Sequence, residues 1–89
     1  MNKALNSQLS SAVTFALNGE WQQAHIIAQE SNDPVACWIH AVLHKIEGDE
    51  SNSRYWYARS GAHRYEDYSD LDAELQAIAQ QLDKNIDKT

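Results

Sequence analysis

The chain has 89 residues, 43% of them hydrophobic, a net charge of −6 at pH 7 and one cysteine. This length is that of one small domain, and the composition is globular rather than disordered. The acidic balance, without a Lys- and Arg-rich run, argues against binding to nucleic acid or an anionic membrane, because both require clustered positive charge. A single cysteine excludes an internal disulfide framework and fits a reducing compartment. Because the sequence also starts without an apolar leader segment, we expect a cytoplasmic protein.

The first third of the chain predicts two helices joined by a glycine turn. Apolar residues at helical spacing predict a helix from about Lys3 to Leu17. Gly19 tolerates the left-handed conformation that a helix end needs, so the first helix should stop there. A second helix is predicted over about Glu20–Glu30, with Trp21 and Ala28 on its apolar side.

The third predicted helix has the clearest apolar stripe in the chain. Asp33 is placed to cap its N-terminus, and Pro34 occupies the first helical position, where its missing N–H costs nothing. The helix should run over Pro34–Glu47 and end at Gly48. Its stripe consists of Val35, Trp38, Ile39, Val42, Leu43 and Ile46. We expect Trp38 to lie in the core, since large aromatic side chains dominate small helical cores.

A fourth helix is predicted to begin after Asp49, whose carboxylate can cap it, and to end at Gly61. The residues that follow, 62–68, should be irregular.

A fifth helix is predicted over about residues 69–86. It should begin at a capping box made by Ser69 and Asp72. Its apolar positions are Leu71, Leu75, Ile78 and Leu82. Its outer, solvent-exposed face is expected to carry Asp72, Glu74, Gln76, Gln80, Gln81 and Lys84.

An internal repeat recurs in the chain at a fixed spacing of 29 residues. The matched pairs are Ala12 and Ala41, Gly19 and Gly48, Ala24 and Ser53, and Ala28 and Tyr57. In both copies an acidic residue, Glu20 or Asp49, follows the glycine. Such a spacing is typical of stacked units that bury their apolar faces against one another. The sequence therefore predicts an all-α domain with two antiparallel helical hairpins, at about residues 3–31 and 33–61, and a C-terminal capping helix.

These hairpins resemble the tetratricopeptide class, in which a small residue, a Gly-Asp turn, an alanine and an aromatic residue recur. The resemblance covers about Ala12 to Gly61 and implies paired helices followed by a capping helix. The spacing is shorter than in the usual tetratricopeptide repeat, and the first copy has Ala28 where the second keeps the aromatic Tyr57. The run WIHAVLHKIEGD at residues 38–49, continuing to NSRYWY at residues 52–57, also resembles small uncharacterised bacterial and fungal helical proteins, which implies no activity.

The third helix carries a candidate metal site. His40 and His44 are four residues apart, so both can point at one ion, while Glu47 could add an oxygen ligand and Cys37 a sulfur ligand. These residues lie on the side of the helix opposite the apolar stripe. Without a metal they would form an outer face, or pack against another repeat through their ring edges. Because no second cysteine and no evident orienting carboxylate accompany them, we expect no cofactor and no catalytic residue.

The run RYWYAR at Arg54–Arg59 is a candidate binding surface. Three consecutive aromatic residues on a helix point in three directions, so one face cannot bury them all. Trp56 should pack on the third helix with Tyr57 at its border, while Tyr55 should be exposed beside Arg59. Tyrosine and arginine are enriched in interface hot spots. The candidate partner-binding residues are Tyr55, Arg59, His63, Arg64 and Tyr65.

Three functions are compatible with these features. The first is a small cytoplasmic interaction module that binds a protein or peptide. The second is a metal-binding or metal-dependent catalytic protein that uses His40, His44 and Glu47. The third is a self-associating scaffold, because two hairpins are fewer than the three or so repeats that stacked architectures need. Its homodimer would form through the first helix or, less favourably, through the aromatic patch.

Overall fold

The computed structural model describes residues 3–87, which form five α-helices, one short 3₁₀ turn and no strand. The helices are α1 (Lys3–Leu17), α2 (Trp21–Ala28), α3 (Pro34–Ile46), α4 (Glu50–Tyr57) and α5 (Leu71–Asp87), and the turn η1 is Tyr65–Asp67. The predicted all-α class is therefore confirmed. None of the helices in the described part of the chain combines the length and the apolar character that a membrane span needs.

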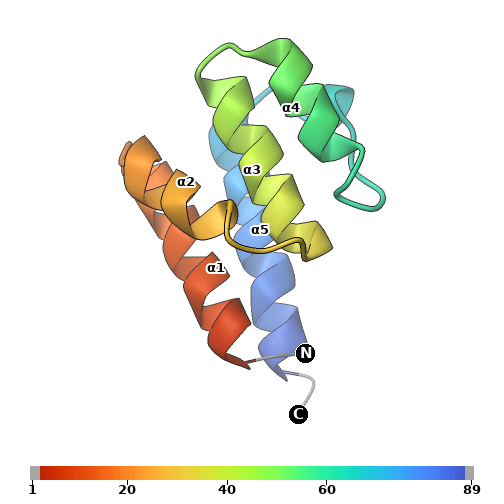
Figure 1. Cartoon of the computed structure of the whole chain (residues 1–89). Coiled ribbons are helices and arrows are strands. Elements are labelled where there is room, and N and C mark those ends of the chain that lie inside the picture. The colour runs from red at the N-terminus through yellow and green to blue at the C-terminus, as the bar shows by residue number, and fades with distance from the viewer. Residues whose placement is uncertain (1–2, 88–89) are drawn as a thin grey trace.

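Helix α3 is the centre of the molecule and contacts each of the other four helices (Figure 1). Nine consecutive residues of α3, from Val35 to Leu43, are buried. A helix that is buried on all sides has no solvent face. Of the two arrangements expected for this side without a metal, the outer face is wrong for Cys37 and His40, because both are buried by neighbouring helices. His40 instead meets His25 of α2 in an edge-on ring contact.

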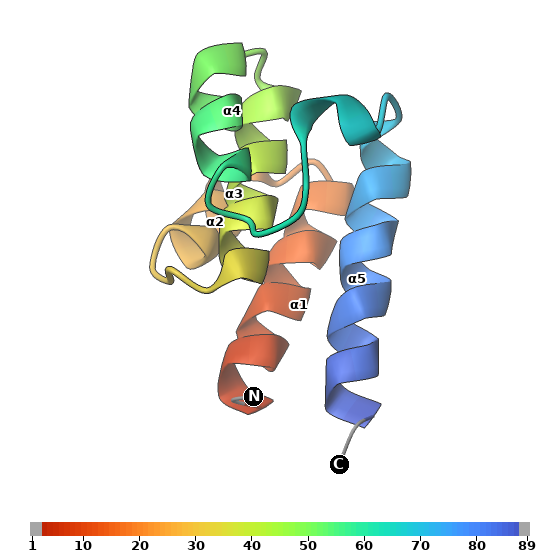
Figure 2. The same cartoon turned by 90° about the vertical axis from the view of Figure 1, so that its right-hand side faces the viewer.

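Helices α1 and α5 run side by side in opposite directions, so that α1 begins where α5 ends (Figure 2). The side-chain amide of Asn6 on α1 donates a hydrogen bond to the carbonyl of Leu82 on α5, 3.4 Å away. Because α5 also contacts α3, it covers both halves of the chain rather than one end. Leu9 and Val13 of α1 are consequently buried within the chain, and the first helix does not present them to a second copy.

The two glycine turns adopt the conformation that the repeat predicts. Gly19 has a φ of +79° and Gly48 a φ of +84°, so both lie in the left-handed region that favours glycine. The small residues at the other repeat positions are fully buried, namely Ala12, Ala24, Ala41 and Ser53. The hydroxyl of Ser53 donates to the carbonyl oxygen of Ala41 over 2.7 Å, which ties α4 to α3.

Local capping signals determine where three helices begin. Asp33 accepts a hydrogen bond from the Val35 amide at 3.0 Å, and Asp49 accepts one from the Asn52 amide at 3.3 Å, as expected. The cap of α5 differs from the prediction. The carboxylate of Asp70, rather than the hydroxyl of Ser69, accepts a hydrogen bond of 3.2 Å from the backbone amide of Ala73. The helix begins at Leu71 because this aspartate, not the serine before it, satisfies the free amide.

The second and fourth helices are shorter than predicted. Helix α2 ends at Ala28, and α4 ends at Tyr57, four residues before Gly61. The Ser60 hydroxyl donates to the Tyr57 carbonyl at 2.7 Å, so a side chain satisfies a free carbonyl at the end of α4.

Candidate functional site

All three arginines of the chain lie between residues 54 and 64, on α4 and the segment that follows it. Arg54 pairs with two carboxylates, those of Glu50 and Glu66, and its charge is therefore balanced within the chain. Arg64 is 74% exposed, with its Nε 3.9 Å from Asp67 Oδ1. This region therefore carries three of the seven lysine and arginine residues of an acidic protein.

Tyr55 and Arg59 form the exposed part of this region, as the sequence predicts. Tyr55 is 49% exposed, and the guanidinium carbon of Arg59 lies 4.1 Å from the centre of its ring. A guanidinium over an aromatic face is held by a cation–π interaction. In the described part of the chain, Arg59 makes no ion pair with a carboxylate, so its charge is available to an external group.

Two other predicted binding residues hold the segment after α4 on the core. The imidazole of His63 stacks on the indole of Trp38, with ring centroids 3.5 Å apart. Tyr65 lies between two cations, with Lys45 Nζ 4.9 Å and Arg54 Cζ 4.5 Å from its ring centre. Both rings are half-buried. His63 and Tyr65 therefore hold the segment after α4 on the core rather than presenting their rings to a partner.

Glu74 on α5 accepts three hydrogen bonds inside the protein. Its carboxylate receives the indole N–H of Trp38 at 2.9 Å, the hydroxyl of Tyr57 at 2.6 Å and the ammonium of Lys45 at 3.1 Å. Glu74 is 0% exposed, so its predicted place on the outer face of the fifth helix is wrong. Burial, and then the Glu74 carboxylate, raises the pKa of Tyr57 far above its ordinary value, which keeps the hydroxyl protonated as a donor.

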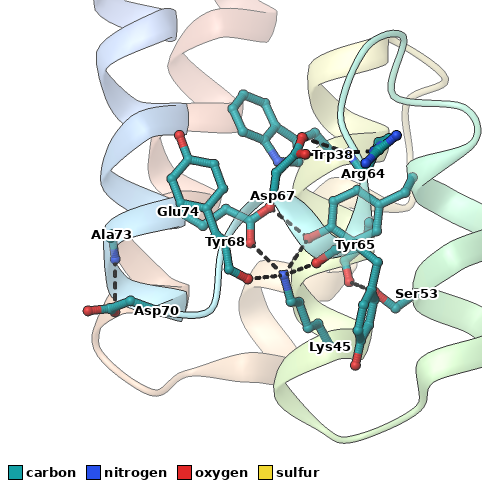
Figure 3. Close-up of polar contacts among 12 residues, drawn as sticks. Trp38, Lys45, Ser53, Arg64, Tyr65, Asp67, Tyr68, Asp70, Ala73 and Glu74 are labelled. Atoms are coloured by element: carbon teal, nitrogen blue, oxygen red, sulfur yellow. Dashed lines mark hydrogen bonds and ion pairs between the residues drawn. The ribbon is translucent and has the colours of Figure 1, made fainter.

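The ammonium group of Lys45 joins this carboxylate to the segment after α4 (Figure 3). Besides Glu74, it donates to the backbone carbonyls of Tyr65 at 2.8 Å and Tyr68 at 2.9 Å. These carbonyls belong to the first residue of η1 and to the residue that follows it. Lys45 therefore fixes the backbone that lies between α4 and α5.

A second cluster consists of three histidines at the contact of α2 and α3. The Nε2 atoms of His25, on α2, and His40, on α3, lie 3.2 Å apart. His44 lies one helical turn beyond His40, with ring centroids 4.9 Å apart. One ring nitrogen from each of the three lies within 4.8 Å of the others. These residues therefore place three imidazole donors around one point.

Two indoles hold the histidine rings in place. Trp21 stacks on His25 with centroids 4.7 Å apart and planes 11° from parallel, and Trp56 stacks on His40 at 4.0 Å and 13°. The indole N–H of Trp21 donates to the carbonyl of Leu43 at 2.7 Å, which fixes this ring in turn. The expected packing of Trp56 on the third helix is thus made on His40.

Glu47, the predicted oxygen ligand, contacts one of the three histidines directly. Its Oε2 lies 2.7 Å from Nδ1 of His44. A carboxylate on Nδ1 keeps the proton on that nitrogen and directs the lone pair of the ring to Nε2. The orienting carboxylate that the sequence did not reveal is therefore Glu47 itself.

Burial and mutual proximity keep two of the histidines uncharged. Burial, and then the neighbouring His25 and His44, lowers the pKa of His40 to about 4. Burial, and then His44, also lowers the pKa of His25. At neutral pH both rings are therefore neutral and each retains a lone pair.

Cys37 does not join the histidines. Its sulfur lies 3.8 Å from the carbonyl oxygen of Asn32, at the beginning of α3, and burial raises the pKa of its thiol. A thiol with a raised pKa is a poor nucleophile and a poor metal ligand. His25, in contrast, belongs to the cluster although it is not among the residues predicted from the sequence. The available signal was its place four residues after Trp21 on the predicted second helix, since residues at this spacing share one helix face.

Comparison of the chain with protein-family models, with curated proteins and with solved structures finds no match in any of the three.

Proposed function

We propose that this protein is a small cytoplasmic interaction module that binds a protein or peptide through α4 and the start of the following segment. The observation that carries the proposal is the stacked pair of Tyr55 and Arg59, in which an exposed ring stands beside a guanidinium that pairs with no carboxylate of the described residues. Tyrosine and arginine dominate the energetics of many interfaces because they combine a large contact area with directed polar groups.

The chemistry of this surface favours an acidic partner segment. The chain is acidic as a whole, with a net charge of −6, so the positive charges of Arg59 and Arg64 differ in sign from its overall charge. A carboxylate of the partner would pair with Arg59, and an adjacent apolar or aromatic side chain would cover the ring of Tyr55. Opposite charges would also speed the encounter and fix its orientation.

The fold supports binding by holding this surface in place before a partner arrives. Lys45 fixes the backbone at Tyr65 and Tyr68, and His63 stacks on the buried Trp38. A surface that is ordered in the free protein loses less conformational entropy on binding. We therefore infer that α4 and the segment after it act as one rigid recognition unit.

We also infer that residues 3–31 and 33–61 are a pair of tetratricopeptide-like hairpins. The positive φ angles of Gly19 and Gly48, and the buried small residues at equivalent positions, support this relation. Arrays of this class commonly present a surface to a partner chain. The short spacing makes the pair smaller than a usual array, and α5 completes its core.

Affinity capture followed by mass spectrometry tests the proposed function. Wild-type protein is compared with the double variant Tyr55→Ala/Arg59→Ala and with Gln76→Ala/Gln80→Ala, which alters two exposed residues of α5. We expect a partner that the wild type and the α5 variant retain and the α4 variant loses. The same set of captured proteins for all three would contradict the proposal.

A second copy of the chain is the alternative occupant of the Tyr55–Arg59 surface. Sedimentation equilibrium over a hundredfold concentration range distinguishes the two, since the monomer mass is 10.1 kDa. A mass that doubles in the wild type but not in Tyr55→Ala/Arg59→Ala would assign the surface to a homodimer.

A further inference from the structure

We propose that His25, His40 and His44 form a binding site for one divalent transition-metal ion, with Zn²⁺ as the preferred ion. The site lies between α2 and α3, and its test does not depend on the proposed interaction. Its donor set differs from the one that the third helix alone suggests, because His25 replaces Cys37 and Glu47 becomes an orienting group.

The spacing of the nitrogens is close to that of a tetrahedral site. Two ligands at the usual Zn–N distance of about 2.0–2.1 Å in tetrahedral geometry stand about 3.3–3.4 Å apart. The Nε2 atoms of His25 and His40 are 3.2 Å apart, so the first edge of the tetrahedron already exists. All three nitrogens lie within 4.8 Å of one another, so the third nitrogen has to approach the others by no more than about 1.4 Å to reach the tetrahedral spacing.

The stacked indoles leave the coordinating edges of the rings free. Trp21 lies on a face of His25 and Trp56 on a face of His40, whereas a metal approaches an imidazole nitrogen in the plane of the ring. The rings of His25 and His40 are almost perpendicular, at 88°. Their nitrogens can therefore converge on one point while both faces remain packed, which is the pre-organisation that a metal site needs.

The hydrogen bond between His44 and Glu47 orients one of the three proposed metal-binding rings. Metal-binding histidines usually donate their other N–H to a carboxylate or a carbonyl, which orients the ring and strengthens the lone pair. The contact of 2.7 Å between His44 Nδ1 and Glu47 Oε2 meets this requirement. It leaves Nε2 of His44 as the donor atom.

The nature of the donors determines which ions fit. Three neutral imidazoles suit zinc and its neighbours in the first transition row, whereas calcium and magnesium require oxygen ligands. The ion would take the place of the hydrogen between the Nε2 atoms of His25 and His40, and the donor ring would move its proton to Nδ1. This exchange releases no net proton from the His25–His40 pair, and a fourth tetrahedral position remains for water.

Titration of tag-free, chelator-treated protein with ZnCl₂ tests the site, with isothermal calorimetry as the readout. We expect one Zn²⁺ per chain and a rise in melting temperature when zinc is added. Glu47→Gln removes only the carboxylate that orients His44, and it should weaken zinc binding by roughly 10- to 100-fold. His25→Gln removes a ligand, and it should weaken zinc binding by more than this. His63→Gln is the matched control, because it changes the one histidine outside the cluster.

Far-UV circular dichroism shows whether each variant is folded. If His25→Gln loses its helical signal, His44→Gln replaces it as the ligand variant, because it removes a proposed ligand on α3 instead of α2. Zinc affinity that is the same in the folded ligand variant and in the wild type would overturn the proposal. An equal loss in His63→Gln, or a wild-type protein that binds no zinc, would overturn it as well.

Discussion

The ammonium of Lys45 lies 3.1 Å from Oε1 of Glu74, in an ion pair that joins α3 to α5 inside the protein. The side chains are 9% and 0% exposed. Such a pair tolerates burial only when its remaining donors and acceptors are bonded. Lys45 meets this condition through two backbone carbonyls, and Glu74 meets it through Trp38 and Tyr57.

Replacing Lys45 alone should therefore destabilise the protein strongly. Lys45→Met leaves the Glu74 carboxylate buried without its counter-ion, which is expected to lower the free energy of unfolding by about 3–5 kcal/mol. Urea denaturation measures this loss. Lys84→Met, an exposed lysine on α5, should change stability by less than about 0.5 kcal/mol. Equal midpoints for Lys45→Met and wild type would show that the pair is unimportant.

Trp38→Ala should cost about 3–5 kcal/mol, because it leaves a cavity in a small core and removes a donor to Glu74. Trp38 is 2% exposed, so the surrounding helices would have to collapse to fill the space. Near-UV circular dichroism and thermal melting measure the effect. Trp38→Phe, which keeps most of the volume, should retain the tertiary signal; a fully native Trp38→Ala protein would refute the role of this residue in the core.

Gly48→Val should lower stability by about 1 kcal/mol or more through backbone strain. The φ of +84° is unfavourable for a β-branched residue, although the described residues beyond its two chain neighbours place no atom within 4 Å of an added Cβ. Gly48→Asn is the informative control, since asparagine tolerates the left-handed region. Coincident melting curves for Gly48→Val and wild type would be inconsistent with a helix stop at this position.

The metal-free protein should lose stability as the pH falls from about 6.5 to about 4. Burial, His25 and His44 together lower the pKa of His40 from 6.5 to about 4. Above this window the ring is neutral in both the folded and the unfolded chain, so it contributes no pH dependence. Within the window the unfolded chain binds a proton that the folded chain does not, and the loss, on the order of 3 kcal/mol, is complete below about pH 4.

Urea denaturation in the presence of a chelator measures this dependence. Carboxyl groups of model peptides titrate mostly below about pH 5, so the pH range above this value reports on the histidines. The comparison is therefore made between pH 6.5 and pH 5. His40→Gln should flatten the decline there, whereas His63→Gln should keep it. A decline of equal slope in His40→Gln would show that another group is responsible.

Features that depend on short stretches of sequence could be predicted well. Asp33 and Asp49 cap the helices that they precede, and Gly19 and Gly48 end the helices before them. Each of these residues acts on backbone groups within a few positions, so its role does not depend on the rest of the fold. The bounds of α1 agree with the prediction for the same reason.

Features that depend on distant segments could not be predicted. Glu74 looks like a surface residue on an amphipathic helix, and only the contact between α5 and α3 reveals that it is buried. His25 joins His40 because α2 packs against α3. One signal was present in the sequence: no Asp, Glu, Lys or Arg stands between Asp33 and Lys45, which is typical of a helix that is buried on all sides.

The most direct measurement is the affinity of the purified protein for the acidic segment of a captured partner, determined by calorimetry for wild type, Tyr55→Ala and Arg59→Ala. Each substitution removes one half of the exposed pair, and each is expected to raise the dissociation constant by about 30-fold or more, as for a hot-spot residue. Binding should also weaken with added salt, since Arg59 contributes a charge. Dissociation constants for both variants within about twofold of the wild type would contradict recognition through Tyr55 and Arg59.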